Sequence, residues 1–335
     1  MRYKHLLKQD LANKDGDEIE TGLDRKKVRK MVVDPIHGLH GFFLCENELF
    51  YNHFRSRKIH EVRLNTNTGI VRSVEIYQEN SNETDVFEIL VGTEQGQVFH
   101  GCIMVENDSL NYLDDFVQVL DVPSLRPILE IKVQRVRLNK KTKTVALLAC
   151  DSSIYQCVGE STQTLKSILI EHGKNEKLLH DGSLSIDMKK RQRGEEGDES
   201  DRVKLHFTVN PSQKTVTGFG WSTEYGLGLG DFQPDSFLAK QKNFKLIPFL
   251  KKEGKEVSEN EWPIDFTITD FHIVFVYLDN VTVLSKVTRE VVFDKGFPFG
   301  QDNRLVGTVF DRISKQLLVY SRQQPLCVAK LHGED

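Results

Sequence analysis

Long hydrophobic runs are absent from this chain of 335 residues. No stretch approaches the ~18 consecutive apolar residues of a membrane-spanning helix, so we expect no transmembrane segment. The first ten residues, Met1 to Asp10, lack the apolar core of a signal peptide, which predicts a cytosolic protein. The three glycosylation sequons, at Asn82, Asn107 and Asn280, are therefore interpreted as chance matches.

Cysteine is also scarce. The five cysteines form neither a CxxC pair nor a spacing with histidine that would hold zinc. Cys150 and Cys157 flank one expected turn and could face each other, so a disulfide between them is one interpretation. Free thiols in the core are the other, and we favour them in a reducing compartment.

Sequence signatures of catalysis and of metal binding are missing. The chain contains no HExxH, no GxSxG and no cysteine-protease motif, so nucleophilic catalysis has no support. His37, His40, His53 and His60 are close in sequence, but no carboxylate stands at ligand spacing beside them. We predict no catalytic residue, no bound metal and no cofactor.

Two further motifs are incomplete. Residues Asn13–Glu20 place oxygen ligands as a calcium loop does, but position six is Glu18 and position twelve is Asp24, so we expect a solvated acidic loop. Gly226–Gly230 reads GxGxG without a following helix to bind phosphate, which favours a strand in close backbone contact near a crowded axis.

The chain also lacks a large excess of charge of either sign, because its formal net charge is only −4. Basic and acidic residues are interspersed, which argues against a nucleic-acid-binding protein. Lys189–Arg193 is a basic run that could be a nuclear signal or a lipid contact, but the acidic run Gly194–Asp201 follows it at once. We predict that 174–202 is a charged flexible loop, and that it is the candidate partner contact or a simple spacer.

What the chain does contain is a hairpin pattern, two β-rich apolar runs split by a polar turn, found six times. The copies are Phe42–Phe54, Ile89–Phe99, Val145–Val158, Phe219–Phe232, Ile273–Val283 and Leu317–Lys330. Their turns are separated by roughly 43 to 73 residues, and removing part of 174–202 restores a period of about 40 to 50, which is typical of a four-stranded propeller blade.

Further strands are expected between the hairpins because apolar and polar residues alternate there. They are Val28–Val33, Val71–Tyr77, Phe116–Leu120, Ile131–Leu138, Val203–Val209 and Ile264–Ile268. Helical periodicity is scarce, and Met1–Ala12 fits a helix or a first strand equally well. Trp221 and Trp262 are interpreted as core anchors.

These observations predict an all-β fold, a β-propeller with seven blades and an incomplete first blade. Radial repetition of blades solves the problem of unpaired sheet edges. We expect 1–335 to be a single domain, with 1–27 as a partial first blade or a disordered segment.

Four stretches resemble the N-terminal propeller of the vacuolar protein sorting-associated protein 18 family of class C tethering subunits. They are Val28–Pro35 with Gly38 and Gly41, Ile89–Phe99, Phe219–Trp221, and Thr269–Val276 followed by Val281 and Val291–Phe293. The hairpin Ile89–Phe99 looks like the "ILVGT-x-x-G-x-I/V-F" hairpin of that family.

The resemblance implies a non-catalytic scaffold of the HOPS and CORVET tethers, which hold late endosomes and lysosomes or vacuoles together before fusion. The implied partners are class C subunits, SNARE-associated proteins and membrane-bound small GTPases, and the implied location is the cytoplasmic face of those membranes. Members of the family continue into an α-solenoid and a zinc domain, so the resemblance implies that this chain is either a fragment or an incomplete gene product.

Two rival functions remain open at this point. One is a propeller enzyme, of glycosidase or lyase type, whose carboxylates or histidines would converge at the channel mouth. The other is a WD-type scaffold of another pathway, although the chain lacks the Gly-His and Trp-Asp signatures of that class.

Overall fold

The structure is a computed structural model. It describes residues 28–33, 40–45, 48–53, 58–64, 69–78, 86–106, 109–113, 116–122, 126–186, 203–210, 215–223, 226–249, 262–269, 271–277, 280–296, 305–311, 316–321 and 327–330. The chain divides into two compact units. The first comprises 1–63, 105–111 and 259–335, and the second comprises 64–104 and 112–258.

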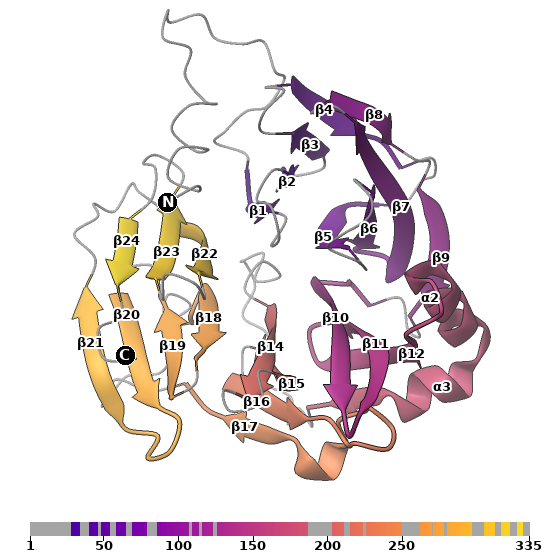
Figure 1. Cartoon of the computed structure of the whole chain (residues 1–335). Coiled ribbons are helices and arrows are strands. Elements are labelled where there is room, and N and C mark those ends of the chain that lie inside the picture. The colour runs from indigo at the N-terminus through magenta and orange to yellow at the C-terminus, as the bar shows by residue number, and fades with distance from the viewer. Residues whose placement is uncertain are drawn as a thin grey trace, which may run out of the picture. The chain divides into compact units, whose positions relative to one another are not determined.

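Three antiparallel sheets of the first unit are described, and in each the strands follow one another in chain order (Figure 1). Two sheets have four strands and the third has three. The strands are β1 (Lys30–Val33), β2 (His40–Leu44), β3 (Leu49–His53) and β4 (Lys58–Val62); β18 (Asp265–Ile268), β19 (His272–Val276), β20 (Asn280–Ser285) and β21 (Val291–Gly296); and β22 (Leu305–Asp311), β23 (Gln316–Ser321) and β24 (Cys327–Lys330).

Three larger sheets belong mainly to the second unit. The first has five strands, because both β8 and β9 pair with the long strand β7, and the other two have four. The strands are β5 (Val71–Tyr77), β6 (Val86–Thr93), β7 (Gln97–Glu106), β8 (Ser109–Leu113) and β9 (Val117–Asp121); β10 (Glu130–Leu138), β11 (Lys141–Ala149), β12 (Ser153–Glu160) and β13 (Ser183–Ser185); and β14 (Lys204–Asn210), β15 (Thr215–Thr223), β16 (Gly226–Asp231) and β17 (Lys245–Ile247).

All six predicted hairpins are confirmed as antiparallel pairs of strands. They are β2–β3, β6–β7, β11–β12, β15–β16, β19–β20 and β23–β24. The β6–β7 turn shows the local cause: Gly96 has φ +79°, and the Thr93 hydroxyl accepts the Gln97 N–H at 3.2 Å. Glycine tolerates this positive φ, which lets the chain reverse within a few residues.

The strands expected between the hairpins are confirmed too. Five of the six coincide with the strands that open a sheet, β1, β5, β10, β14 and β18. The sixth, Phe116–Leu120, overlaps β9, which adds to β7 in place of opening a new sheet.

The prediction of seven blades with an incomplete first blade is wrong. The described residues form five sheets of four or five strands, which are complete blades, and one sheet of three strands. The first described sheet, β1 to β4, already has four strands. The physical reason is that six hairpins supply six sheets, whereas the seventh blade rested on a ring-closure argument for 1–27. Those residues lie outside the described part of the chain.

Strand β11 shows how the core of the second unit is built. Val145, Leu147 and Ala149 pack in a cluster with the β14–β17 sheet, while Ala146 and Leu148 pack in a cluster with the β5–β9 sheet. All five side chains are fully buried. Because successive side chains of a strand point to opposite faces, a strand buried on both faces is apolar without alternation.

One helix, in the connection between β12 and β13, packs against two of these sheets. Helix α2 (Leu165–Lys174) begins at Thr164, whose side chain accepts the N–H of Ser167, and its buried residues recur at helical spacing at Leu165, Ile168, Leu169 and His172. These residues face β9 and β12, beside which the helix lies in Figure 1. The apolar stripe thus decides both the helix and where it docks.

The expected flexible loop 174–202 is partly ordered. Its first part forms α3 (Glu176–Asp181), capped by the side chain of Asn175, and then β13. Leu179 and Leu184 are both 2 % exposed, so short apolar anchors hold this charged segment to its sheet. Residues 187–202, with the basic run Lys189–Arg193 and the acidic run after it, lie outside the described residues.

Candidate functional site

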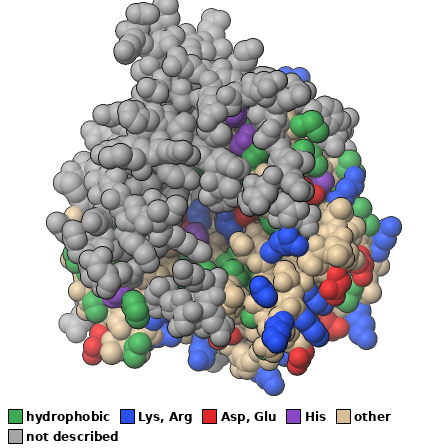
Figure 2. Space-filling view, viewed as in Figure 1, with side chains coloured by type: hydrophobic (Ala, Val, Ile, Leu, Met, Phe, Trp, Pro, Cys, Tyr) green, Lys and Arg blue, Asp and Glu red, His purple; other side chains and the backbone are tan. Residues whose placement is uncertain are grey.

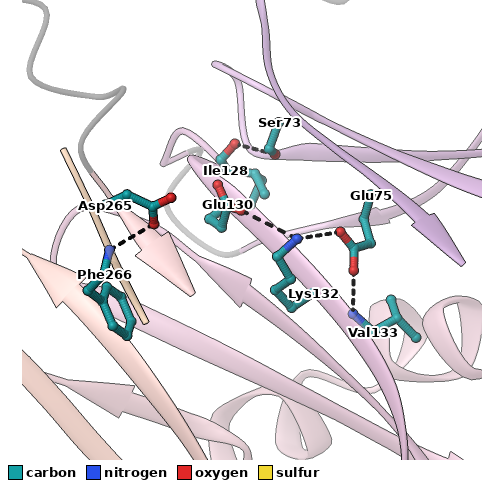
Figure 3. Close-up of polar contacts among 8 residues, drawn as sticks. All are labelled: Ser73, Glu75, Ile128, Glu130, Lys132, Val133, Asp265 and Phe266. Atoms are coloured by element: carbon teal, nitrogen blue, oxygen red, sulfur yellow. Dashed lines mark hydrogen bonds and ion pairs between the residues drawn. The ribbon is translucent and has the colours of Figure 1, made fainter. Parts of the chain in front are cut away.

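The strongest cluster of buried charge lies between the two opening strands β5 and β10. The Lys132 ammonium donates to Glu75 Oε2 at 2.7 Å and lies 3.8 Å from Glu130 Oε1. The backbone N–H of Val133 donates to the other Glu75 oxygen at 3.3 Å (Figure 3). Glu75 is 8 % exposed and Glu130 is 4 % exposed. Both oxygens of Glu75 are therefore bound to groups of the neighbouring sheet.

Burial dominates the electrostatics of this cluster. Desolvation raises the pKa of Glu75 above its ordinary value, and the nearby Glu130 adds to the rise, although Lys132 and the Val133 N–H oppose it. Because the pKa of Glu75 is higher in the folded chain than in the unfolded one, its contribution to the free energy of unfolding is present at low pH. That contribution is lost as the pH rises through the folded pKa. Burying an ion pair costs desolvation, so the pair joins the two sheets without being by itself a large source of stability.

A second contact fastens the same two sheets. The Ser73 hydroxyl donates to the carbonyl of Ile128 at 2.7 Å (Figure 3). In the first unit, the Asp265 carboxylate accepts the N–H of its neighbour Phe266 at 2.8 Å, a local bond at the start of β18. The contacts of Glu75 and Ser73 join neighbouring sheets and that of Asp265 is local, so all three are structural bonds.

Two glutamines join the β10–β13 sheet to the segment between β16 and β17. The buried Gln156 amide donates to the carbonyls of Gly182 and Ala239, both at 3.0 Å, and accepts the Ala239 N–H at 2.8 Å. Gln241, in the 3-10 turn η4 (Gln241–Asn243), accepts the Ser185 N–H at 2.9 Å and donates to its carbonyl at 2.8 Å. These two amide clamps hold neighbouring sheets through backbone groups that would otherwise need water.

The histidines near the start of the chain partly come together. His40 and His53 are register partners on β2 and β3 with ring centroids 5.2 Å apart, and His40 Nδ1 lies 2.9 Å from the Tyr51 hydroxyl. His60 on β4 lies beside Tyr51, with centroids 6.4 Å apart. His37 lies outside the described residues. Among the described residues, no group of three or more His, Cys, Asp or Glu side chains could hold a metal ion.

Cys150, directly after β11, and Cys157, within β12, are free and buried. Burial raises the pKa of the Cys150 and Cys157 thiols to about 12 each. The interpretation as free core thiols is confirmed, and the disulfide is not formed. Because the thiolate is the nucleophile, neither sulfur is activated for chemistry.

The glycine-rich strand and the tryptophan behave as structural features. A Cβ at Gly228 would meet the ring of Phe244, and one at Gly230 would meet the ring of Phe219. A Cβ at Gly226 would meet the Ile247 carbonyl, so the three glycines are in close contact with aromatic rings and with backbone of the same segment. Trp221 is fully buried in the cluster shared by the β10–β13 and β14–β17 sheets, which confirms it as a core anchor. Trp262 is half-buried, and residues 13–20 lie outside the described part.

Sequence reasoning missed the sites at Glu75, Gln156 and the α2–α3 insertion. An isolated Glu or Gln in an apolar strand carries a weak signal, since its partners stand 57 and 83 residues away. The helix had a usable signal in the spacing of Leu165, Ile168 and Leu169 after Thr164. No helix of the described residues is long and apolar enough to cross a membrane.

With this geometry established, comparison with known proteins identifies the family. A sequence model of the Pep3/Vps18/deep orange β-propeller domain matches residues 1–324. The chain belongs to this family. The match confirms the resemblance drawn from the hairpin sequences, and it confirms the β-propeller class of the repeated four-stranded sheets.

One curated relative and one solved structure complete the comparison. The protein "Vacuolar sorting protein 18" of Arabidopsis thaliana is 19% identical over 313 residues, which cover 89% of this chain and 29% of the relative. This chain therefore matches less than a third of that relative's length. The solved structure "Structure of Dos1 propeller" has a TM-score of 0.49 and 8% sequence identity, covering 96% of this chain and 70% of that one.

Proposed function

We propose that this chain is the propeller module of a subunit of an endolysosomal tethering complex, HOPS or CORVET, acting in vesicle docking and fusion and in protein transport to the lysosome or vacuole. The observation that carries the proposal is the family match over residues 1–324. The relative named for vacuolar sorting supports the same process. In this proposal, 1–335 forms one non-catalytic domain.

The described polar contacts favour a scaffold. Glu75, Lys132 and Gln156 bind groups of neighbouring sheets, so their chemistry serves to hold the blades rigid. A rigid set of blades presents its turns in fixed positions, which is what a docking platform needs. The proposed partners are class C vacuolar protein sorting subunits, SNARE-associated proteins and membrane-bound small GTPases. The proposed location is the cytoplasmic face of late endosomes, lysosomes or vacuoles, reached through the complex.

The test is capture of partners by the purified chain, followed by depletion in cells. We expect tagged chain to retain class C subunits from purified mixtures, and its depletion to delay delivery of cargo to the lysosome or vacuole. A variant that unfolds the second unit, Trp221→Ala, should lose capture and is the negative control. Normal delivery after complete depletion, together with no capture, would overturn the proposal.

A further inference from the structure

The β10–β11 hairpin concentrates positive charge in a chain whose net charge is −4. From Ile131 to Cys150 the sequence contains no carboxylate but carries six cations: Lys132, Arg135, Arg137, Lys140, Lys141 and Lys143. Figure 2 shows exposed lysine and arginine side chains, with some acidic ones, over the lower part of the view, where this hairpin ends and where β16 and β17 lie in Figure 1. The local excess is therefore a surface feature of the fold.

The six cations divide by their partners. Three are engaged, since Lys132 binds Glu75, Arg135 donates to the Ser161 carbonyl and Lys143 pairs with Glu160 at 3.0 Å. The other three are Arg137, Lys140 and Lys141, whose side chains are exposed. Within the described residues these three have no ion pair or hydrogen-bond partner of their side chains. The free charge thus gathers at the tip.

The backbone of the tip is unusual for the residues that it carries. Asn139 has φ +46° and Lys140 has φ +66°, and Leu138 pairs with Lys141 across the two-residue turn. Turns of this geometry favour Asn followed by Gly, because glycine has no Cβ to strain. Lysine at the second position places a cation at the outermost point of the turn, where glycine would fit the backbone better.

We propose that this hairpin tip, Arg137 with Lys140 and Lys141, is a contact for the anionic lipid headgroups of a membrane surface. Lysine suits a diffuse anionic surface, because its ammonium is a mobile point charge and does not demand the paired geometry of arginine. Cations near an anionic leaflet are attracted within about a Debye length.

The shape of the tip favours a membrane over an acidic protein segment. Recognition of an acidic peptide relies on side chains that converge, usually beside an apolar anchor. Here the cations project from a convex turn, and the apolar residues of the hairpin near it are buried or half-buried, as Val136 and Leu138 show. The inference goes beyond the proposed function, because class C subunits could bind the chain whether or not this tip meets lipid.

The experiment is sedimentation of the full chain with vesicles of phosphatidylcholine, with and without phosphatidylserine. We expect binding only when the anionic lipid is present, and weaker binding as salt is raised. Lys140→Gln with Lys141→Gln should weaken vesicle affinity about fivefold for each cation removed, since each contributes on the order of 1 kcal/mol near such a surface. Lys174→Gln with Lys177→Gln, exposed cations of α2 and α3, is the matched control and should bind as the parent chain does.

Lys140→Gly separates binding from folding. It removes one cation while relieving the turn, so affinity should fall about fivefold while the unfolding midpoint stays the same or rises. Equal binding to both kinds of vesicle, or full binding by these variants, would overturn the proposal. Binding of the tip to polyglutamate without binding to vesicles would overturn it too, and would assign an acidic protein ligand. Capture of class C subunits by Lys140→Gln, Lys141→Gln should be unchanged, which separates this test from that of the proposed function.

Discussion

Strands β13 and β21 are the outer strands of two four-stranded sheets with the same order of strands, but one is covered and the other is exposed. In β13, Leu184 is 2 % exposed, and the backbone of Ser185 is bound on both sides by the Gln241 amide. In β21, Val291, Val292 and Phe293 are 46 %, 55 % and 48 % exposed. The pairing of β21 with β20 shifts register between Val283 and Leu284, so the strand is bulged.

The comparison shows that sheets with the same order of strands can protect their outer edges by different means. An open edge invites pairing with another strand, and a bulge or a cover prevents it. In the β10–β13 sheet, α2, α3 and two glutamines cover the outer edge. Strand β21 has a bulge instead, and its apolar side chains are about half exposed. We therefore expect substitutions around β13 to cost far more than those on β21.

The largest effect should come from the helix that covers the sheet. Leu169→Ala removes a fully buried side chain between α2 and the strands it faces, and should lower the free energy of unfolding by about 3 kcal/mol. Urea denaturation followed by circular dichroism measures this. Lys174→Ala, exposed at the end of the same helix, is the control and should change little. A loss below about 1 kcal/mol would show that α2 contributes little to the cover.

The next effect concerns the buried amide clamp. Gln156→Leu keeps the approximate size of the side chain but leaves the N–H and carbonyl of Ala239 without this partner, whereas the Gly182 carbonyl keeps the backbone N–H of residue 156. We expect a loss of about 2 kcal/mol. The same denaturation experiment applies. Gln241→Leu removes the exposed clamp, whose backbone groups can turn to water, and should cost less. If both variants lost the same amount, burial would not be what distinguishes the two clamps.

A smaller effect should appear as a dependence on pH. His172 Nε2 lies 3.1 Å from the Val158 N–H, and desolvation lowers the pKa of His172 below its ordinary value. The unfolded chain therefore takes up this proton first, so stability should fall as pH drops below about 6.5, by at most about 1.4 kcal/mol per pH unit. Denaturation at several pH values measures the slope.

The control for this slope is a second histidine. His172→Gln should flatten the dependence between the ordinary pKa and the lowered one, while His180→Gln, at an exposed position of α3, should leave it in place. A slope that survives His172→Gln would assign the acid sensitivity to other groups. Such a result would weaken the view that α2 is a cover sensitive to proton uptake.

The smallest effect is expected at the open edge. Val292→Lys places a charge on a half-exposed position of β21, and should change the free energy of unfolding by no more than about 0.5 kcal/mol. Leu184→Lys in β13 would bury a charge and should be severely destabilising. Comparing the two midpoints tests the contrast between the edges directly. A large loss for Val292→Lys would mean that β21 is covered after all.

The periodic part of the fold was predictable from sequence. Apolar runs split by polar turns located the six hairpins of the sequence analysis, because alternation along a strand and turn chemistry are local properties. Gly96 and the bulk of Trp221 were readable for the same reason. The number of blades was misjudged, because a seventh was added for 1–27 on a ring-closure argument, whereas the six hairpins match the six sheets of the described residues.

The polar contacts between sheets were not predictable either. Glu75 and Gln156 meet partners far along the chain, so a single sequence gives no sign of them. The order in the first part of the charged segment after Lys174 was not anticipated because composition was weighed over the whole stretch, whereas Leu179 and Leu184 are buried within it. The cations of the β10–β11 hairpin were visible in the sequence, but their freedom from ion pairs required the fold.

The contact of Gly228 with the ring of Phe244 has a consequence for how this sequence can change over time. Any side chain at 228 would need the space that the ring occupies, and a smaller residue at 244 would leave a gap that only a larger residue at 228 could fill. Neither position is free to drift alone, so the two should be inherited together.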